Sequence, residues 1–187
     1  MTHEFCPEKY ILQHFTTIQT EALSKLKTLK YNSAHYWGSP HNELSPDYSM
    51  PNNEFLYYWV KGWTNDEKWL SHALMFMEKF EQPDMETVKI FKHIVEQTGW
   101  KIVLVGYSLL RPGGSIQPHI DESESEGWNN VWHLGISVPD KCYFTVGGKK
   151  YKEKDHRIIK FDDSKEHSAV NDSEEDRLVL YIKFSNI

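Results

Sequence analysis

The sequence has little cysteine, no long apolar run and no excess of positive charge, and each absence excludes a class of protein. Cys6 and Cys142 are its only cysteines, too few for a disulfide framework, which favours a reducing compartment. No stretch approaches the roughly 20 apolar residues of a membrane-spanning helix. Residues Met1–Cys6 lack the basic and apolar regions of a signal peptide, so we expect a cytoplasmic protein without a membrane partner. A formal net charge of −6 argues against a nucleic-acid partner.

The length and composition are those of one folded enzyme-sized domain. The chain has 187 residues, and hydrophobic residues make up 39% of it. At about 150 residues per domain, this length predicts a single domain over residues 1–187. Within it, residues 1–100 suggest helices and loops, and residues 101–187 suggest short strands and turns.

The first hundred residues predict three helices and one long loop. Apolar spacing predicts a helix over Thr17–Leu29. The aromatic-rich stretch Tyr31–Thr64 predicts a loop, within which Phe55–Val60 could form a strand. A second helix is expected between an Asp66 N-cap and Pro83, and a third between Asp84 and Gly99.

From Trp100 onward, the sequence is typical of an antiparallel β-sandwich or jelly roll. Gly147-Gly148 predicts a two-residue hairpin turn. Short runs of β-forming residues at regular spacing favour this architecture over a parallel sheet. The expected strands are Lys101–Leu110, Ser115–Ile120, Val131–Val138, Tyr143–Val146, Lys149–Lys152, Ile158–Phe161 and Arg177–Phe184.

One short motif suggests metal chemistry. His119 and Asp121 are separated by one residue, so on a strand their side chains share a face while Ile120 points away. A second histidine from a distant strand would complete two imidazoles and one carboxylate, the ligand set of non-haem Fe(II) oxygenases. The alternative is a structural hydrogen-bonded pair at a strand end.

Several stretches together resemble the aspartyl/asparaginyl β-hydroxylase family. The resemblance extends from about Tyr107 to Phe184 and preserves the order and spacing of its motifs. It implies a mainly β, double-stranded β-helix fold (a cupin-like jelly roll), with helices and a long loop from the N-terminal half, and Fe(II)/2-oxoglutarate-dependent dioxygenase chemistry with O2. The motifs are Ser108–Gly114, Pro118–Asp121, His133–Ile136, Asp162–His167 and Arg177–Leu180.

The resemblance also implies a metal site. His119 and His167 correspond to the two iron-binding histidines of the family. Animal members carry glycine where this chain has Asp121, so Asp121 is expected to complete a triad of His119, Asp121 and His167. Asp162 and Asp163 are expected to shape the turn before His167.

A co-substrate site follows from the same resemblance. Ser108 and Arg177 correspond to the pair that holds the far carboxylate of 2-oxoglutarate, and His133 to the histidine beside its other carboxylate. Two alternatives stay open: Arg177 as a surface residue paired with Glu174 or Glu175, and His133 as a packed strand residue.

The residues expected to contact the substrate differ from those of the family. Asn129–Trp132 stands where animal members have arginines that engage an acidic substrate, and Arg111 and Lys61 are other candidate cations. The acidic stretch Asp121–Glu126 would attract a cationic group and repel an anionic one, which favours a neutral or basic substrate. We therefore expect a free amino acid or small metabolite, with a peptidyl aspartyl or asparaginyl residue as the alternative.

A function of another class is a non-catalytic, cupin-like module that binds a metal or ligand. A structural metal site is usually closed by four protein ligands, whereas the three expected here leave positions open. The helical N-terminal half and its aromatic loop are the expected lid over such an open site.

Overall fold

The computed structural model describes residues 5–29, 31–36, 59–61, 67–77, 80–121 and 130–185. Three helices contribute to it: α1 (Pro7–Gln13), α2 (Phe15–Lys27) and α3 (Glu86–Thr98). The strands are β1 (Tyr31–Tyr36), β2 (Trp59–Lys61), β3 (Trp69–Phe76), β4 (Phe80–Glu81), β5 (Lys101–Leu110), β6 (Ser115–His119), β7 (Asn130–Ser137), β8 (Cys142–Val146), β9 (Lys149–Lys152), β10 (Ile158–Asp162), β11 (His167–Asn171) and β12 (Arg177–Ser185). Within these ranges, no helix is both long and apolar enough to cross a membrane.

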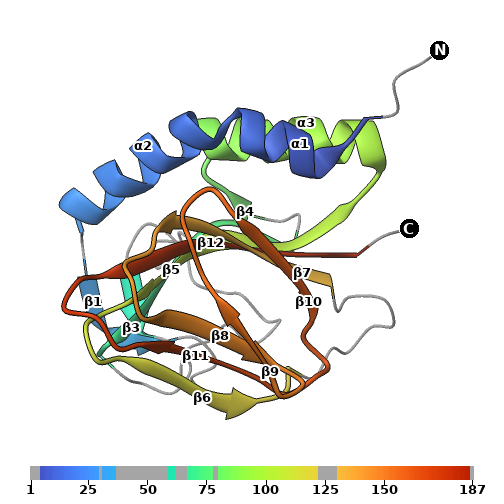
Figure 1. The fold of residues 1–187 in the computed structure, drawn as a ribbon. Coiled ribbons are helices and arrows are strands. Elements are labelled where there is room, and N and C mark those ends of the chain that lie inside the picture. Colours follow the sequence, from blue (N-terminus) through green and yellow to red (C-terminus); the bar gives the residue numbers. More distant parts are fainter. Residues whose placement is uncertain are drawn as a thin grey trace.

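The strands form two facing sheets, which confirms the predicted double-stranded β-helix. The larger sheet has the strand order β1-β2-β3-β5-β12-β7-β10, with β4 paired to β3, and the smaller has β6-β11-β8-β9. The three helices lie across the outer face of the larger sheet, and the smaller sheet lies on its other side (Figure 1).

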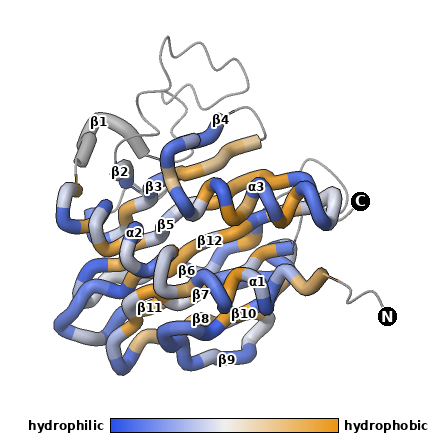
Figure 2. Tube along the Cα trace, turned by 90° about the horizontal axis from the view of Figure 1, so that it is seen from above, coloured by the Kyte–Doolittle hydropathy of each residue, from blue (hydrophilic) through white to orange (hydrophobic). Residues whose placement is uncertain are grey.

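The alternation of β12 explains how one strand serves both sides of the larger sheet. Leu178, Leu180, Ile182 and Phe184 belong to the core between this sheet and the helices. The intervening residues face the space between the two sheets, where a second apolar cluster lies. Seen from the helix side, hydrophobic positions run along α3 and the strands beneath it (Figure 2).

Most of the predicted strands are confirmed, and β5 and β9 have the predicted bounds. The turn between β8 and β9 is also confirmed, because Gly147 and Gly148 have φ angles of 52° and 75°. Positive φ at both central residues is the requirement of a type I′ turn, and glycine meets it without steric cost.

The helix expected between Asp66 and Pro83 is wrong, because strands β3 and β4 form within that segment. Seven of the eight positions of β3, beginning at Trp69, are buried, since the helices cover one face of the strand and the second sheet faces the other. An apolar run buried on both faces cannot be distinguished from a buried helix by periodicity alone. β3 pairs with β5 in the larger sheet, so the core also draws on the N-terminal half.

The start of α3 differs from the prediction as well. Met85, not Asp84, is its N-cap residue, and it makes no side-chain cap. The carboxylate of Glu21 on α2 accepts hydrogen bonds from the backbone N–H groups of Glu86 (2.8 Å) and Thr87 (2.9 Å). A tertiary contact therefore caps the helix, and Gly99 ends it as predicted, with φ of 71°.

Candidate metal and co-substrate site

Three potential metal ligands converge at one end of the smaller sheet. His119 ends β6 and His167 begins β11, and the two residues are opposite each other in the antiparallel pairing. Asp121 follows β6, where its N–H donates a hydrogen bond to the backbone oxygen of Asp163 (3.1 Å). One ligand atom from each of His119, Asp121 and His167 lies within 4.8 Å of the others. The structure thus brings together the three residues predicted to bind metal.

Hydrogen bonds orient both imidazoles. Nδ1 of His119 lies 2.7 Å from the backbone oxygen of Gln117, and Nδ1 of His167 lies 2.9 Å from that of Lys165. Because a carbonyl only accepts, each Nδ1 carries the proton and each Nε2 carries the lone pair. Burial lowers the pKa of His167, and the neighbouring His119 lowers it further. The neutral imidazole that results at neutral pH is the form that binds metals.

A cavity of about 150 Å³ opens beside this cluster and is lined by both sheets. Its walls carry large side chains, including Trp69, Phe144 and Tyr181. Small residues of β3 and β5 also line the cavity: Ser71, Ala73, Gly106 and Ser108. At Gly106 a Cβ atom would come within 2.7 Å of the backbone oxygen of His72, so the close pairing of the two strands requires glycine.

Ser108 lies on this cavity with its hydroxyl already oriented. The indole Nε1 of Trp69 donates a hydrogen bond to its Oγ, at 3.1 Å. Since the indole N–H is only a donor, the Ser108 hydroxyl accepts and can still donate its own proton to a ligand. The structure therefore brings Ser108 to the same cavity as the three candidate metal ligands, as the family resemblance implies.

Arg177 is placed differently from Ser108, because it is not one of the residues that line the cavity. Its side chain is fully buried at the start of β12 and forms a two-pronged ion pair with Glu153. Nε lies 2.8 Å from Oε2 and Nη2 lies 2.5 Å from Oε1. The alternative of a surface Arg177 paired with Glu174 or Glu175 is wrong.

His133 connects this ion pair to the cavity. It lines the cavity, and its Nδ1 lies 3.7 Å from Oε1 of Glu153. Burial lowers the pKa of His133. For Glu153, burial alone would raise the pKa, but Arg177 and His133 outweigh it and lower the pKa to about 2. Both Nδ1 of His133 and Nη1 of Arg177 are buried without a hydrogen-bond partner.

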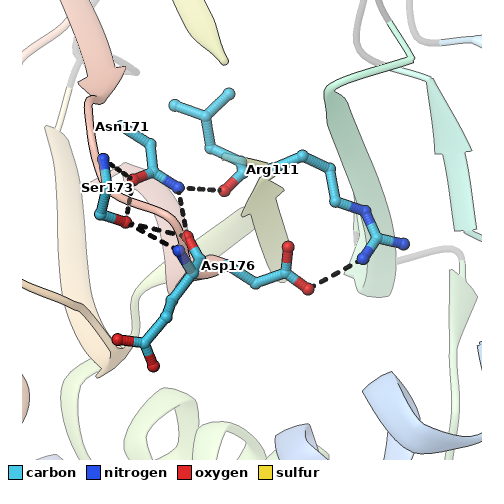
Figure 3. A network of polar contacts seen from close by, with 6 residues as sticks. Arg111, Asn171, Ser173 and Asp176 are labelled. Atoms are coloured by element: carbon cyan, nitrogen blue, oxygen red, sulfur yellow. Dashed lines mark hydrogen bonds and ion pairs between the residues drawn. The ribbon is translucent and has the colours of Figure 1, made fainter. Parts of the chain in front are cut away.

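The turn between β11 and β12 holds Arg177 in place. The side-chain amide of Asn171 donates hydrogen bonds to the backbone oxygens of Leu110 and Glu175, each at 2.8 Å, and its oxygen accepts from the Ser173 hydroxyl at 2.6 Å (Figure 3). Arg111 pairs with Asp176 at 2.8 Å in the same network. Arg111 therefore stabilises this turn and does not line the cavity.

Sequence reasoning missed two charged residues near the site. Glu153 follows β9 in a lysine-rich stretch that suggests a solvated surface, and nothing in that stretch indicates that it is buried. Asp163 was expected only to shape a turn, which Asp162 does by accepting hydrogen bonds from Ser164. Asp163 is instead fully buried, and its carboxylate lies 2.7 Å from Nζ of Lys183.

Other predictions fall outside the described residues or away from the cavity. Three sets of residues lie outside the described ranges. They are the acidic stretch after Asp121, Asn129, and most of the aromatic loop that was expected to act as a lid. Lys61, a candidate cation, lies 3.4 Å from the carboxylate of Glu67.

Comparison with known proteins identifies the family. A profile described as aspartyl/asparaginyl β-hydroxylase matches residues 13–186. The chain belongs to this family.

The proteins similar to this chain include one from a virus and one from a bacterium. The uncharacterized protein L888 of Acanthamoeba polyphaga mimivirus is 28% identical over 130 residues, which cover 68% of this chain and 47% of that protein. The chain thus spans about half the length of this curated relative. A crystal structure of an oxidoreductase of the 2OG-Fe(II) oxygenase family from Burkholderia pseudomallei superimposes with a TM-score of 0.50 and 13% identity, covering 64% of this chain and 69% of that one. At this identity, the similarity shows a shared fold.

Proposed function

We propose that the protein is an Fe(II)- and 2-oxoglutarate-dependent hydroxylase with His119, Asp121 and His167 as its metal ligands. The observation that carries the proposal is the convergence of their three ligand atoms within 4.8 Å on the wall of a cavity. Two imidazole nitrogens and one carboxylate oxygen form the donor set that suits a non-haem Fe(II) centre.

The same donor set favours an enzyme over a binding module. Structural metal sites are closed by four protein ligands, whereas three protein ligands leave coordination positions for other molecules. Here the three ligands adjoin a cavity with a mainly apolar lining and a few polar groups, an arrangement common in sites for small molecules.

Ser108, His133 and Arg177 are proposed to hold 2-oxoglutarate. Ser108 can donate a hydrogen bond, and Arg177 offers Nη1, a buried donor without a hydrogen-bond partner. Such a donor is costly unless a ligand or water satisfies it, and a carboxylate is the strongest partner for it. When bound, the iron and 2-oxoglutarate would supply the oxidative chemistry, while the protein binds, orients and excludes water.

The proposed substrate is a free amino acid or small metabolite. None of the described residues that line the cavity is an arginine or lysine, so an acidic side chain of a substrate buried there would lack a cationic partner, which is costly. Tyr181 also lines the cavity. Burial raises the pKa of its hydroxyl, so this hydroxyl stays a neutral hydrogen-bonding group. The alternative substrate, an aspartyl or asparaginyl residue in a peptide, takes its support from the family description.

A turnover screen tests this function. The protein is incubated with Fe(II), 2-oxoglutarate and either matched free amino acids or Asp- and Asn-containing peptides, and succinate and a mass gain of one oxygen atom are measured. A clear preference for the Asp peptide would reject the small-molecule substrate and retain the hydroxylase. Anaerobic addition of Fe(II) and 2-oxoglutarate should also produce a visible charge-transfer band, which a pure binding module with one closed metal site would lack.

A further inference from the structure

Glu153 and Arg177 form a buried ion pair directly behind the cavity. The Glu153 side chain is 2% exposed and that of Arg177 is 0% exposed. Glu153 takes the Nε and Nη2 edge of the guanidinium, and its Oε1 also lies 3.7 Å from Nδ1 of His133 on the cavity wall. A carboxylate of the protein therefore already holds part of the group that is proposed to bind a carboxylate of the ligand.

Glu153 contacts Nε and Nη2 of the Arg177 guanidinium, so Nη1 is the nitrogen that remains available to a ligand. Nη1 is buried without a hydrogen-bond partner. On β5, Leu110 is directly opposite Arg177, and Ser108 lies two residues earlier on the same face of the sheet. Diagonal neighbours across an antiparallel pair lie within reach of a long side chain. A ligand carboxylate between Ser108 and Arg177 would therefore meet Nη1 while Glu153 keeps the other edge.

Resting on the proposed function, we propose that Glu153 is a built-in counter-ion that competes with the distal carboxylate of the co-substrate for Arg177. Two carboxylates on one guanidinium repel each other, and the positive charge that attracts the ligand is already neutralised. Glu153 thereby weakens dicarboxylate binding and sets the concentration at which the site fills, while it stabilises Arg177 in the ligand-free protein.

The size of the effect follows from Coulomb's law. Two unit charges about 6 Å apart at an effective dielectric constant near 20 repel enough to change a dissociation constant more than tenfold. The low pKa of Glu153 means that it is ionised at neutral pH, so this repulsion is present under ordinary conditions.

Equilibrium binding of glutarate to the full chain without added metal tests the proposal. Glutarate carries both carboxylates of 2-oxoglutarate but lacks the keto group, so its binding reports the carboxylate subsite independently of turnover. Calorimetry compares the wild type with Glu153→Gln, which removes the charge, and Glu153→Asp, which keeps the charge but shortens its reach. The matched control is Asp140→Asn, because Asp140 forms an exposed ion pair with Lys152 at 2.7 Å.

Glu153→Gln is expected to lower the Kd for glutarate by about tenfold or more, and Glu153→Asp by about threefold, while Asp140→Asn leaves it within about twofold. Glu153→Asp retains an anion beside Arg177 and keeps the test valid if Glu153→Gln does not fold. An unchanged or higher Kd in a folded Glu153 variant would overturn the competition. If the wild type itself binds no glutarate, the proposed co-substrate site fails instead, so the two failures are distinguishable.

Discussion

Acid should destabilise this protein through Glu153, and the size of the effect can be calculated from its pKa. The pKa falls from an ordinary value of 4.5 to about 2 in the folded state, where Arg177 holds the ionised form. At 1.36 kcal/mol per pKa unit, this decrease corresponds to about 3 kcal/mol of folding free energy. The contribution is complete above the unfolded-state pKa and is lost as the pH falls from about 4.5 towards 2. About 2 kcal/mol should be lost by pH 3.

Urea unfolding of the wild type and Glu153→Gln at pH 7 and pH 3 measures this contribution. At pH 7, the variant should be less stable by about 3–5 kcal/mol, the usual cost of removing one partner of a buried ion pair. At pH 3, that difference should shrink by about 2 kcal/mol, because only the wild type has a Glu153 to protonate. Comparing the two proteins at each pH cancels the titration of the other carboxylates. A difference that is the same at both pH values would refute the reasoning.

Three further outcomes are expected. His167→Ala should abolish Fe(II) binding measured by calorimetry. The control His93→Ala, at a half-exposed residue of α3 that packs against Tyr10 and does not line the cavity, should leave Fe(II) binding intact; wild-type affinity in the first variant would reject the metal assignment. Ser108→Ala should weaken 2-oxoglutarate binding by roughly 10- to 100-fold, because a hydrogen bond to a charged group contributes about 1.5–3 kcal/mol, while Fe(II) affinity stays unchanged. Gly135→Ala should lower the unfolding temperature markedly, since its Cβ would lie 2.0 Å from the backbone oxygen of Lys154; a wild-type melting curve would contradict this packing.

Most of the strands and two of the three proposed metal ligands were predictable because their signals are local. Alternation marks β12, paired glycines mark the β8–β9 turn, and the spacing of His119 and Asp121 places them on one face. His167 needed the family resemblance, since nothing within its own segment indicates that it lies opposite His119.

What the sequence concealed depends on tertiary contacts. β3 has no polar face because both of its sides are covered, so its pattern also fits a helix. Glu153 lies among lysines in the sequence, and only the fold directs it inward to Arg177. Glu21 caps a helix 65 residues further along the chain, a contact that no local capping rule could predict.

The position of the two histidines also affects local stability. His119 lies on β6, which ends the strand order of the smaller sheet, and His167 lies on the neighbouring strand β11. Terminal strands of a sheet open more readily than central ones, because they have fewer neighbours to hold them. A metal ion bound by both imidazoles would link β6 to β11 and stabilise the pairing of the two strands. Metal loading should therefore slow amide hydrogen exchange in β6 before it alters exchange in β5 or β12, which already lie in the middle of the larger sheet.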